Sequence, residues 1–230
     1  MSYGFFARGT NGQMIIDDTH TTCHVLRKGS FTVPAGDTSG NVNYIYYSAP
    51  ITTLSSPQVW ISIVGGIINF SHEGTPGNWT GFSYVSINNR NAITFKYVAS
   101  TYEPPSSGQQ WGLKIWNDSG KPVFDSGYAG MIFLYATRKY RRTDMGGSGR
   151  SHNYQWDTID PYSVNPNAYF LASSTCLPIY DVGQGNGVGI AYFTAYPTRA
   201  GYYINIFQYN STPNPELWFP VIYAIPSDEM

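Results

Sequence analysis

The sequence predicts an all-β protein made of two tandem, similar, β-sandwich-like modules that arose by internal duplication. Three observations support this prediction: the composition, the alternation of apolar with polar residues along short segments, and a pattern that occurs twice. Aromatic residues make up 17% of the 230 residues and charged residues 12%, while Gly (24) and Pro (15) are frequent. This mixture favours strands and tight turns over helices.

The repeated pattern is YGFFARGTNGQMIIDD at residues 3–18 and WGLKIWNDSGKPVFDS at residues 111–126. Each copy reads as a short strand, a turn that tolerates positive φ and a second strand, which predicts a β-hairpin. The coinciding positions are interpreted as turn-forming and structural: Gly4, Gly12 and Asp17 in the first copy, and Gly112, Gly120 and Asp125 in the second. Gly12 and Gly120 are expected at positive φ, and the two Asp residues are expected to cap backbone amides.

Further short strands are predicted after each hairpin. A third strand is expected at 21–28 in the first half and at 131–140 in the second. Three later pairs of segments resemble each other more weakly: 56–63 with 165–172, 80–87 with 188–196, and 92–100 with 202–210. We therefore expect a first β module at 1–105 and a second at 106–230, joined at the Pro- and Ser-rich stretch YEPPSSGQQ.

Motifs that would carry chemistry are weak or absent. The segment HTTCH at 20–24 has metal-ligand residue types without the spacing of a structural zinc site. The segment GQGNGVG at 183–189 lacks the Lys-Ser/Thr end of a phosphate-binding loop and is interpreted as a hairpin tip. No Gly-x-Ser-x-Gly motif occurs. The sequence therefore predicts no catalytic residue, no metal site and no cofactor, and we do not expect an enzyme.

Charge and cysteine content narrow the class of partner and the compartment. A net charge of −1 argues against nucleic-acid binding and against a membrane surface, because both need a large positive field. No apolar run approaches the length of a membrane span, and no signal-peptide pattern opens the chain. The two cysteines, Cys23 and Cys176, do not occupy equivalent positions of the repeat, so synthesis in a reducing cytoplasm is expected.

One cluster of basic residues is a candidate partner contact. It lies between Thr137 and Arg150, where a strand is expected to run into a Gly-rich loop, and contains Arg138, Lys139, Arg141, Arg142 and Arg150. Three interpretations stay open: a solvated loop base, a contact with an acidic protein surface, and a contact with phosphate on a bacterial surface glycan. Arginine suits the last two because its guanidinium matches carboxylate and phosphate groups.

The six tryptophans are expected mostly in the core, because aromatic rings dominate burial in β proteins. Two of them, Trp79 in EGTPGNWTG and Trp156 in HNYQWD, lie in turn-like sequence and are expected to be exposed. An exposed ring can stack on a sugar or anchor a protein partner.

The repeated pattern resembles the opening of small minor tail proteins of long-tailed bacteriophages, and WGLKIWNDSGKPVFDSGY is the closer match of the two copies. The resemblance implies a structural role in the virion, at the tail tip where tail and fibre join, with a part in host attachment. It also implies other virion tail proteins as partners, synthesis in the host bacterial cytoplasm, and a junction between a six-fold tail tube and a three-fold fibre. A homotrimer of two-module chains would present six similar modules in a pseudo-six-fold ring and could join the two symmetries, so we expect a homotrimer.

Two other classes of function remain as alternatives. A carbohydrate-binding module that recognises host-surface glycans would need exposed aromatic rings beside Asp or Asn residues. A glycan-degrading enzyme would need two carboxylates that face each other across a cleft.

Overall fold

A computed structural model describes the backbone of residues 6–8, 14–17, 20–35, 42–62, 65–86, 92–137, 140–146, 151–158, 167–175, 178–180, 188–195, 202–209 and 221–230. Side chains are described at 20–35, 42–62, 70–85, 92–136, 167–174 and 222–230. These parts are almost entirely β-structure, as the sequence predicts.

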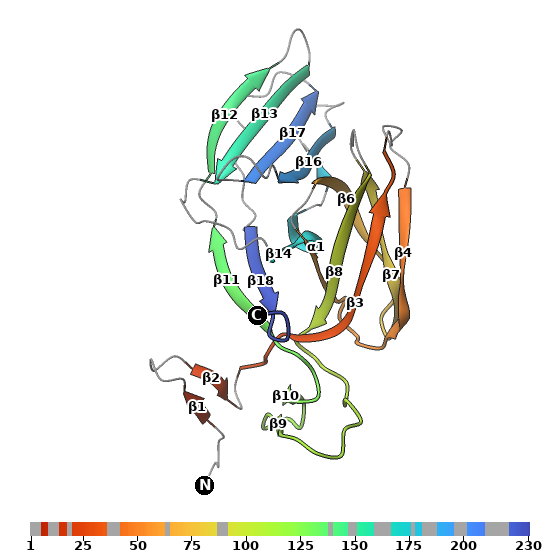
Figure 1. Ribbon diagram of the computed structural model, residues 1–230, viewed down its shortest axis with the longest axis vertical. Coiled ribbons are helices and arrows are strands. Elements are labelled where there is room, and N and C mark those ends of the chain that lie inside the picture. Colours follow the sequence, from red (N-terminus) through yellow and green to blue (C-terminus); the bar gives the residue numbers. More distant parts are fainter. Residues whose placement is uncertain are drawn as a thin grey trace.

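Two large antiparallel sheets form the body of the molecule (Figure 1). The six-stranded sheet contains, in spatial order, β11 (Met131–Thr137), β18 (Val221–Pro226), β14 (Tyr169–Leu171), β5 (Gln58–Ser62), β8 (Ile93–Thr101) and β3 (His24–Val33). The eight-stranded sheet contains β12 (Tyr140–Gly146), β13 (Ser151–Thr158), β17 (Tyr202–Tyr209), β16 (Val188–Ala195), β6 (Gly65–Thr75), β7 (Asn78–Ser86) and β4 (Val42–Ile51), with β15 (Pro178–Tyr180) paired to β16.

Two small hairpins and one short helix complete the described elements. The hairpins are β1 (Phe6–Arg8) with β2 (Met14–Asp17), and β9 (Lys114–Trp116) with β10 (Pro122–Asp125). Both lie at the same end of the molecule, below the large sheets in Figure 1. The helix α1 (Ala172–Thr175) directly follows β14. Within the parts of the chain described, no helix has the length and apolar character needed to cross a lipid bilayer.

The main core lies between the two large sheets. The ring of Phe31 on β3 lies 4.8 Å from that of Tyr84 on β7, and the ring of Tyr97 on β8 lies 5.3 Å from that of Phe82 on β7. Because successive strand residues point to opposite faces, Val59 and Ile61 enter this core while Trp60 enters a second one on the other face of the six-stranded sheet. The architecture is therefore a β-sandwich in which the six-stranded sheet also buries part of its second face.

Both large sheets cross the boundary expected near residue 105. In the six-stranded sheet, β3, β5 and β8 come from the first half of the chain, and β11, β14 and β18 come from the second. Counted inward from the two edges of this sheet, β3 corresponds to β11, β8 to β18 and β5 to β14. The sets meet where β5 pairs antiparallel with β14, and where β6 pairs antiparallel with β16 in the other sheet. Antiparallel pairing of corresponding strands relates the two halves by an approximate two-fold rotation. Duplication of the sequence itself stays a prediction.

The first residues of β3 and β11 also meet in an antiparallel arrangement, with backbone hydrogen bonds in both directions. His24 forms an antiparallel bridge with Gly130. The amide of Val25 donates to the carbonyl of Ala129, and the amide of Met131 donates to the carbonyl of Cys23, each at 2.8 Å. The two edge strands of the six-stranded sheet are therefore tied together at one end.

Three expectations about strands need correction. The segments at 80–87 and 188–196 were expected to correspond, but they form β7 and β16, and the strand that corresponds to β16 across the seam is β6. The segments at 92–100 and 202–210 were expected to correspond, but they form β8 and β17, which lie in different sheets. By position, β17 corresponds to β7 and β18 to β8, because apolar alternation does not distinguish one strand from the next. The loop expected between Thr137 and Arg150 is instead partly strand, since residues 140–146 pair with β13.

Candidate functional site

The hairpin of β9 and β10 has a turn that its sequence specifies. The side-chain oxygen of Asn117 accepts hydrogen bonds from the amides of Ser119 and Lys121, at 3.1 and 2.9 Å. The amide of Gly120 donates to the carbonyl of Asn117 at 2.8 Å, and Gly120 has a φ of 75°. An Asn that caps its own turn and a Gly at positive φ are what a tight hairpin requires. Gly120 is therefore where the sequence places it, at a turn with positive φ.

Asp125 fixes the end of the hairpin to the linker between the halves. Its carboxylate accepts hydrogen bonds from the amide of Ser107 (3.0 Å), the hydroxyl of Ser107 (2.9 Å) and the amide of Gly127 (2.9 Å). The ammonium group of Lys114 lies 3.4 Å from the same carboxylate. Burial alone would raise the pKa of Asp125, but these donors stabilise the charged form and lower the pKa overall. Asp125 therefore caps backbone amides as a buried, ionised carboxylate.

His24 fixes the hairpin to the sandwich. Its Nε2 accepts a hydrogen bond of 3.1 Å from the amide of Asp125, so the neutral ring carries its proton on Nδ1. Burial lowers the pKa of His24, while the Thr22 carbonyl and the Asp125 carboxylate act in the opposite direction. The amide of Thr22 also donates to the carbonyl of Val123 at 3.0 Å. His24 therefore has a structural role, as the acceptor of a hydrogen bond from the hairpin.

The approach to β9 is equally constrained. Gly112 has a φ of 133°, and a Cβ at this position would collide with the hydroxyl of Ser126. The hydroxyl of Ser126 accepts a hydrogen bond from the amide of Leu113 at 2.9 Å, and the amide of Ser126 donates to the carbonyl of Leu113. Glycine at residue 112 therefore allows a close backbone approach that closes the base of the hairpin.

This well-held hairpin places large apolar side chains in solvent. Trp111 is 87% exposed, Trp116 is 53% exposed and Leu113 is 41% exposed. Sequence reasoning missed these residues, because it expected most tryptophans in the core. The available signal was position. Trp116 ends a strand of only three residues, in which Ile115 alone is buried, and Trp111 lies three residues before that strand.

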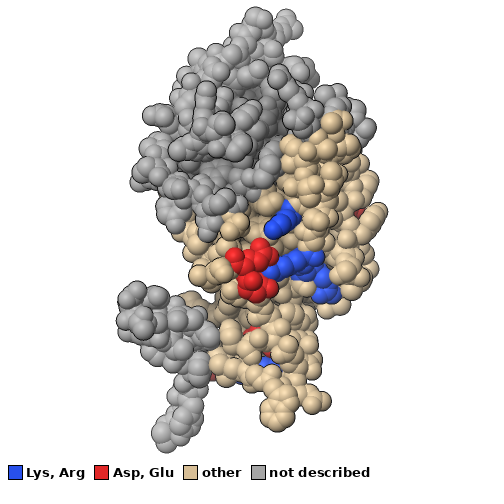
Figure 2. Space-filling view, in the orientation of Figure 1, with Lys and Arg blue, Asp and Glu red and all other residues tan. Residues whose placement is uncertain are grey.

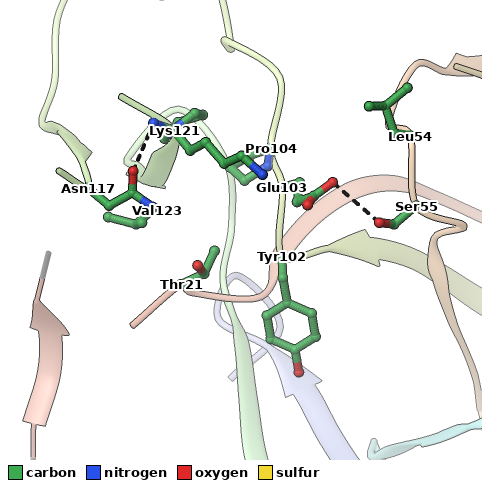
Figure 3. A pocket seen from close by; sticks show the side chains of 10 residues that line it. Thr21, Leu54, Ser55, Tyr102, Glu103, Pro104, Asn117, Lys121 and Val123 are labelled. Carbon is green, nitrogen blue, oxygen red and sulfur yellow. Dashed lines mark hydrogen bonds between the residues drawn. The ribbon is translucent and has the colours of Figure 1, made fainter. Parts of the chain in front are cut away.

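A pocket of about 610 Å³ lies between this hairpin and the sandwich (Figure 3). Its described lining includes Leu54, Ser55, Glu103, Pro104, Asn117 and Lys121. In Figure 3 the side chains of Lys121 and Glu103 extend toward each other from the hairpin and the linker. Glu103 accepts a hydrogen bond of 3.3 Å from the hydroxyl of Ser55. The pocket thus offers one cation, one carboxylate and apolar walls, which suits a polar ligand of low net charge.

Several of the remaining predicted site residues belong to other described strands. Asp17 pairs with Phe6 in the first hairpin. Arg141 and Arg142 lie on β12, opposite Asp157 and Trp156 of β13. The other predicted residues, Gly4, Gly12, Arg138, Lys139 and Arg150, lie outside the described residues, as do the side chains of Asp17, Arg141, Arg142 and Trp156.

Trp79 is not the exposed ring that the sequence suggested. It lies on β7, half-buried, with its ring 5.8 Å from that of His72 and against the main core. Its Nε1 donates a hydrogen bond of 2.9 Å to the carbonyl of Thr53. The turn-like sequence around it is the tight connection between β6 and β7, which directs the ring back onto the sandwich.

The described charged side chains gather near the middle of the face in Figure 2. Lys28 on β3 pairs with Asp228 at 2.6 Å and with Glu229 at 2.8 Å. The hydroxyl of Tyr169 donates a hydrogen bond of 2.8 Å to Glu229. This cluster ties residues 227–230 to β3 and β14 and is structural.

Comparison of the chain with protein-family models, with curated proteins and with solved structures gives no match. Among the described side chains, no three of His, Cys, Asp or Glu come close enough together to hold a metal ion. Cys23 is buried, its thiol donates to the hydroxyl of Ser100 at 3.1 Å, and burial raises its pKa to about 11. The hairpin, its exposed rings and the adjoining pocket are therefore the candidate site.

Proposed function

We propose that this chain is a structural component of a bacteriophage virion, a minor tail protein at the tail tip that joins tail and fibre and contributes to host attachment. The segment that most resembles such proteins, residues 111–126, is the one that folds as the hairpin of β9 and β10. The proposal combines that resemblance with the surface which this hairpin presents.

The exposure of Trp111, Leu113 and Trp116 on a fixed backbone carries the proposal. A partner that covers side chains of this size removes apolar area from water, which favours binding by about 25 cal/mol per Å². Because hydrogen bonds at Asp125 and His24 already order the hairpin, docking costs little further conformational entropy. Ordered, exposed aromatic residues are typical anchors of protein interfaces.

The expected assembly is a homo-oligomer in contact with other tail proteins, with three copies as the state that the resemblance implies. The protein would be made in the host bacterial cytoplasm and reside in the tail. The approximate two-fold between the halves changes how the modules of the predicted ring would be oriented. Neighbouring modules of a trimer would point in opposite directions, so six modules facing one way are not expected.

The test is incorporation into particles. Mass spectrometry of purified particles from the genome that encodes this chain should detect it in the tail fraction. Trp111→Ser combined with Trp116→Ser should reduce its incorporation at least tenfold while the folded state persists by circular dichroism. Tyr46→Ser, at another large exposed side chain that does not line the pocket, serves as the matched control. Particles that lack the protein altogether would refute the virion role.

The pocket beside the hairpin keeps the carbohydrate-binding alternative open at a new position. Glu103, Asn117 and Lys121 offer acceptors and donors, and Leu54 and Pro104 offer apolar walls, as sugar sites commonly do. Its described lining contains one carboxylate, whereas glycoside hydrolysis by the usual route needs two. A glycan-array signal from purified protein that is lost in Glu103→Gln would favour this alternative over a purely structural role.

A further inference from the structure

The pocket between the β9–β10 hairpin and the sandwich has two walls of opposite charge. Lys121, at the end of the hairpin turn, supplies an ammonium group, and Glu103, in the linker between the halves, supplies a carboxylate. Figure 3 shows the two side chains extending toward each other. None of the ion pairs between described side chains includes either of them. Both charges are therefore open to a ligand.

The polar side chains of the hairpin wall offer only donors. The side-chain oxygen of Asn117 already accepts hydrogen bonds from the amide of Ser119 (3.1 Å), the hydroxyl of Ser119 (2.7 Å) and the amide of Lys121 (2.9 Å). These bonds occupy the acceptor of Asn117, so the group that remains for a ligand is its side-chain nitrogen, which donates. The ammonium group of Lys121 also only donates. This wall therefore selects an anionic group with several acceptors.

The linker wall offers an acceptor. The Oε2 atom of Glu103 accepts one hydrogen bond, of 3.3 Å, from the hydroxyl of Ser55. A carboxylate has room for about four hydrogen bonds, so one protein donor leaves most of its acceptor capacity to a ligand or to water. The described lining contains no charged side chain besides Glu103 and Lys121. This wall therefore selects a cationic group with several donors.

Both walls are ordered without a ligand. The hydroxyl of Thr53 donates to the carbonyl of Ser55 at 2.7 Å, which fixes the loop between β4 and β5. The amide of Glu103 donates to the hydroxyl of Thr101 at 3.0 Å, and Asn117 fixes the hairpin turn. A volume of about 610 Å³ is typical of small-molecule sites. Binding at such a preformed pocket costs little ordering of the backbone.

We propose that this pocket binds a small zwitterion, a molecule that carries an ammonium group for Glu103 and a carboxylate for Lys121. The apolar surfaces of Leu54 and Pro104 line the space around the uncharged part of the molecule. Two sources have this chemistry: a sugar with a free amino group and a carboxylate, and a short peptide with free ends. The inference rests on the carbohydrate-binding alternative for the first source only, and on the virion role for neither.

A ligand with a single charge fits this pocket less well. A purely anionic ligand would pair with Lys121 but would bring its charge near Glu103, and a purely cationic ligand would be repelled by Lys121 in the same way. A neutral sugar would lack a charge of its own for either wall. A zwitterion forms a charge-assisted hydrogen bond at each wall, and such bonds are about twice as strong as neutral ones. Affinity should therefore depend on both charges of the ligand.

Binding of matched probes to the full chain tests the proposal. Isothermal titration calorimetry should show binding of muramic acid, a zwitterionic sugar, or of alanyl-alanine, a zwitterionic peptide. Acetylation of the amino group of the bound probe should weaken binding about tenfold, which corresponds to the loss of one charge-assisted hydrogen bond. The probe that binds identifies the source of the ligand.

Charge removal in the protein gives the second measurement. Lys121→Gln and Glu103→Gln should each weaken binding of the zwitterion about tenfold. Lys96→Gln and Glu73→Gln remove the same charges outside the pocket and should leave the affinity unchanged. All four variants should keep the Tm of the native protein, which separates a lost ligand contact from a lost fold.

The proposal is overturned if neither probe binds at millimolar concentration, if acetylation leaves the affinity unchanged, or if binding survives either substitution in the pocket. Glycan binding that depends on Glu103 and not on Lys121 also overturns it, while supporting the carbohydrate-binding alternative. None of these outcomes bears on whether the chain is found in virions. Conversely, zwitterion binding that requires both charges stands even if particles lack the protein.

Discussion

The Nε2 atom of His24 accepts a hydrogen bond from the backbone amide of Asp125, a residue 101 positions further along the chain. His24 is fully buried, and its ring lies 5.8 Å from that of Phe124 and 6.2 Å from that of Tyr128. The contact joins β3 of the sandwich to the end of the hairpin. The imidazole of His24 therefore helps to fix the candidate site to the sandwich, together with the hydrogen bond from the amide of Thr22 to the carbonyl of Val123.

We expect His24→Leu to loosen the hairpin. The substitution leaves the buried amide of Asp125 without an acceptor, which costs about 1–3 kcal/mol. Hydrogen exchange of the Asp125 amide should accelerate, and the free energy of unfolding in urea should fall by a similar amount. Gln110→Leu, at an exposed position in the linker before the hairpin, is the control and should change neither quantity. Unchanged protection of the Asp125 amide in His24→Leu would contradict the role given to His24.

Stability should fall as the pH drops below about 6.5. Burial lowers the pKa of His72 from 6.5 to about 4, and it also lowers the pKa of His24. Between the folded and unfolded pKa values the unfolded chain binds more protons, so acidification favours unfolding by up to about 1.4 kcal/mol per pH unit and per histidine. The contribution of His72 is complete above pH 6.5 and is lost toward pH 4.

Thermal unfolding followed from pH 7 to pH 4 should show this loss, and His72→Gln should have a shallower dependence of Tm on pH. Asp125 acts in a separate window, because its folded pKa lies below the ordinary 3.8. Its stabilisation is present above pH 3.8 and is lost at lower pH. Equal pH profiles for the native protein and His72→Gln would show that the imidazole of His72 is not desolvated as described.

Gly120→Val should destabilise the hairpin more than Gly120→Asn. A φ of 75° is strained for a β-branched residue and tolerated by Asn, although space for a side chain is open at this position. We expect a cost of more than about 1 kcal/mol for Val and a smaller one for Asn. Urea unfolding curves of the two variants give the difference directly. Equal stabilities would mean that the backbone at this turn relaxes to another conformation.

The sequence predicts the local features of the candidate site and misses those that depend on distant pairing. Asn117 and Gly120 specify the turn by short-range chemistry, so the β9–β10 hairpin is predictable. The hydrogen bond from Asp125 to His24 is not, because nothing local links the two residues. The exposure of Trp116 is not predictable either. It depends on whether another part of the chain covers the second face of β9, a strand of only three residues.

The same limit explains why the sequence wrongly predicts an exposed ring at Trp79. The segment EGTPGNWTG is turn-like in composition, but the register of β6 with β7 decides where the ring points. We expect Trp79→Phe to lose the hydrogen bond to the Thr53 carbonyl, at a cost of about 1 kcal/mol. Trp79→Ala should cost about 2–4 kcal/mol, because it also removes packing against the main core. Chemical denaturation measures both, and any glycan binding should survive in Trp79→Phe. Loss of sugar binding in Trp79→Phe without loss of stability would return this residue to the list of ligand contacts.

The chain should unfold in a single cooperative transition, although its sequence reads as two modules. At the seam, Ile61 pairs with Phe170 and Trp60 pairs with Leu171, and side chains from both halves enter both cores. Neither half can lose its strands without exposing apolar surface of the other, so the halves are expected to melt together. Calorimetry should give a van't Hoff enthalpy equal to the calorimetric one.

Phe170→Ala opens a cavity at the seam between the halves. It should destabilise the whole molecule by about 3–5 kcal/mol, and so lower Tm, while unfolding remains a single transition. Two resolved transitions, or a Phe170→Ala variant in which only one half melts early, would show that the shared sheets do not couple the halves.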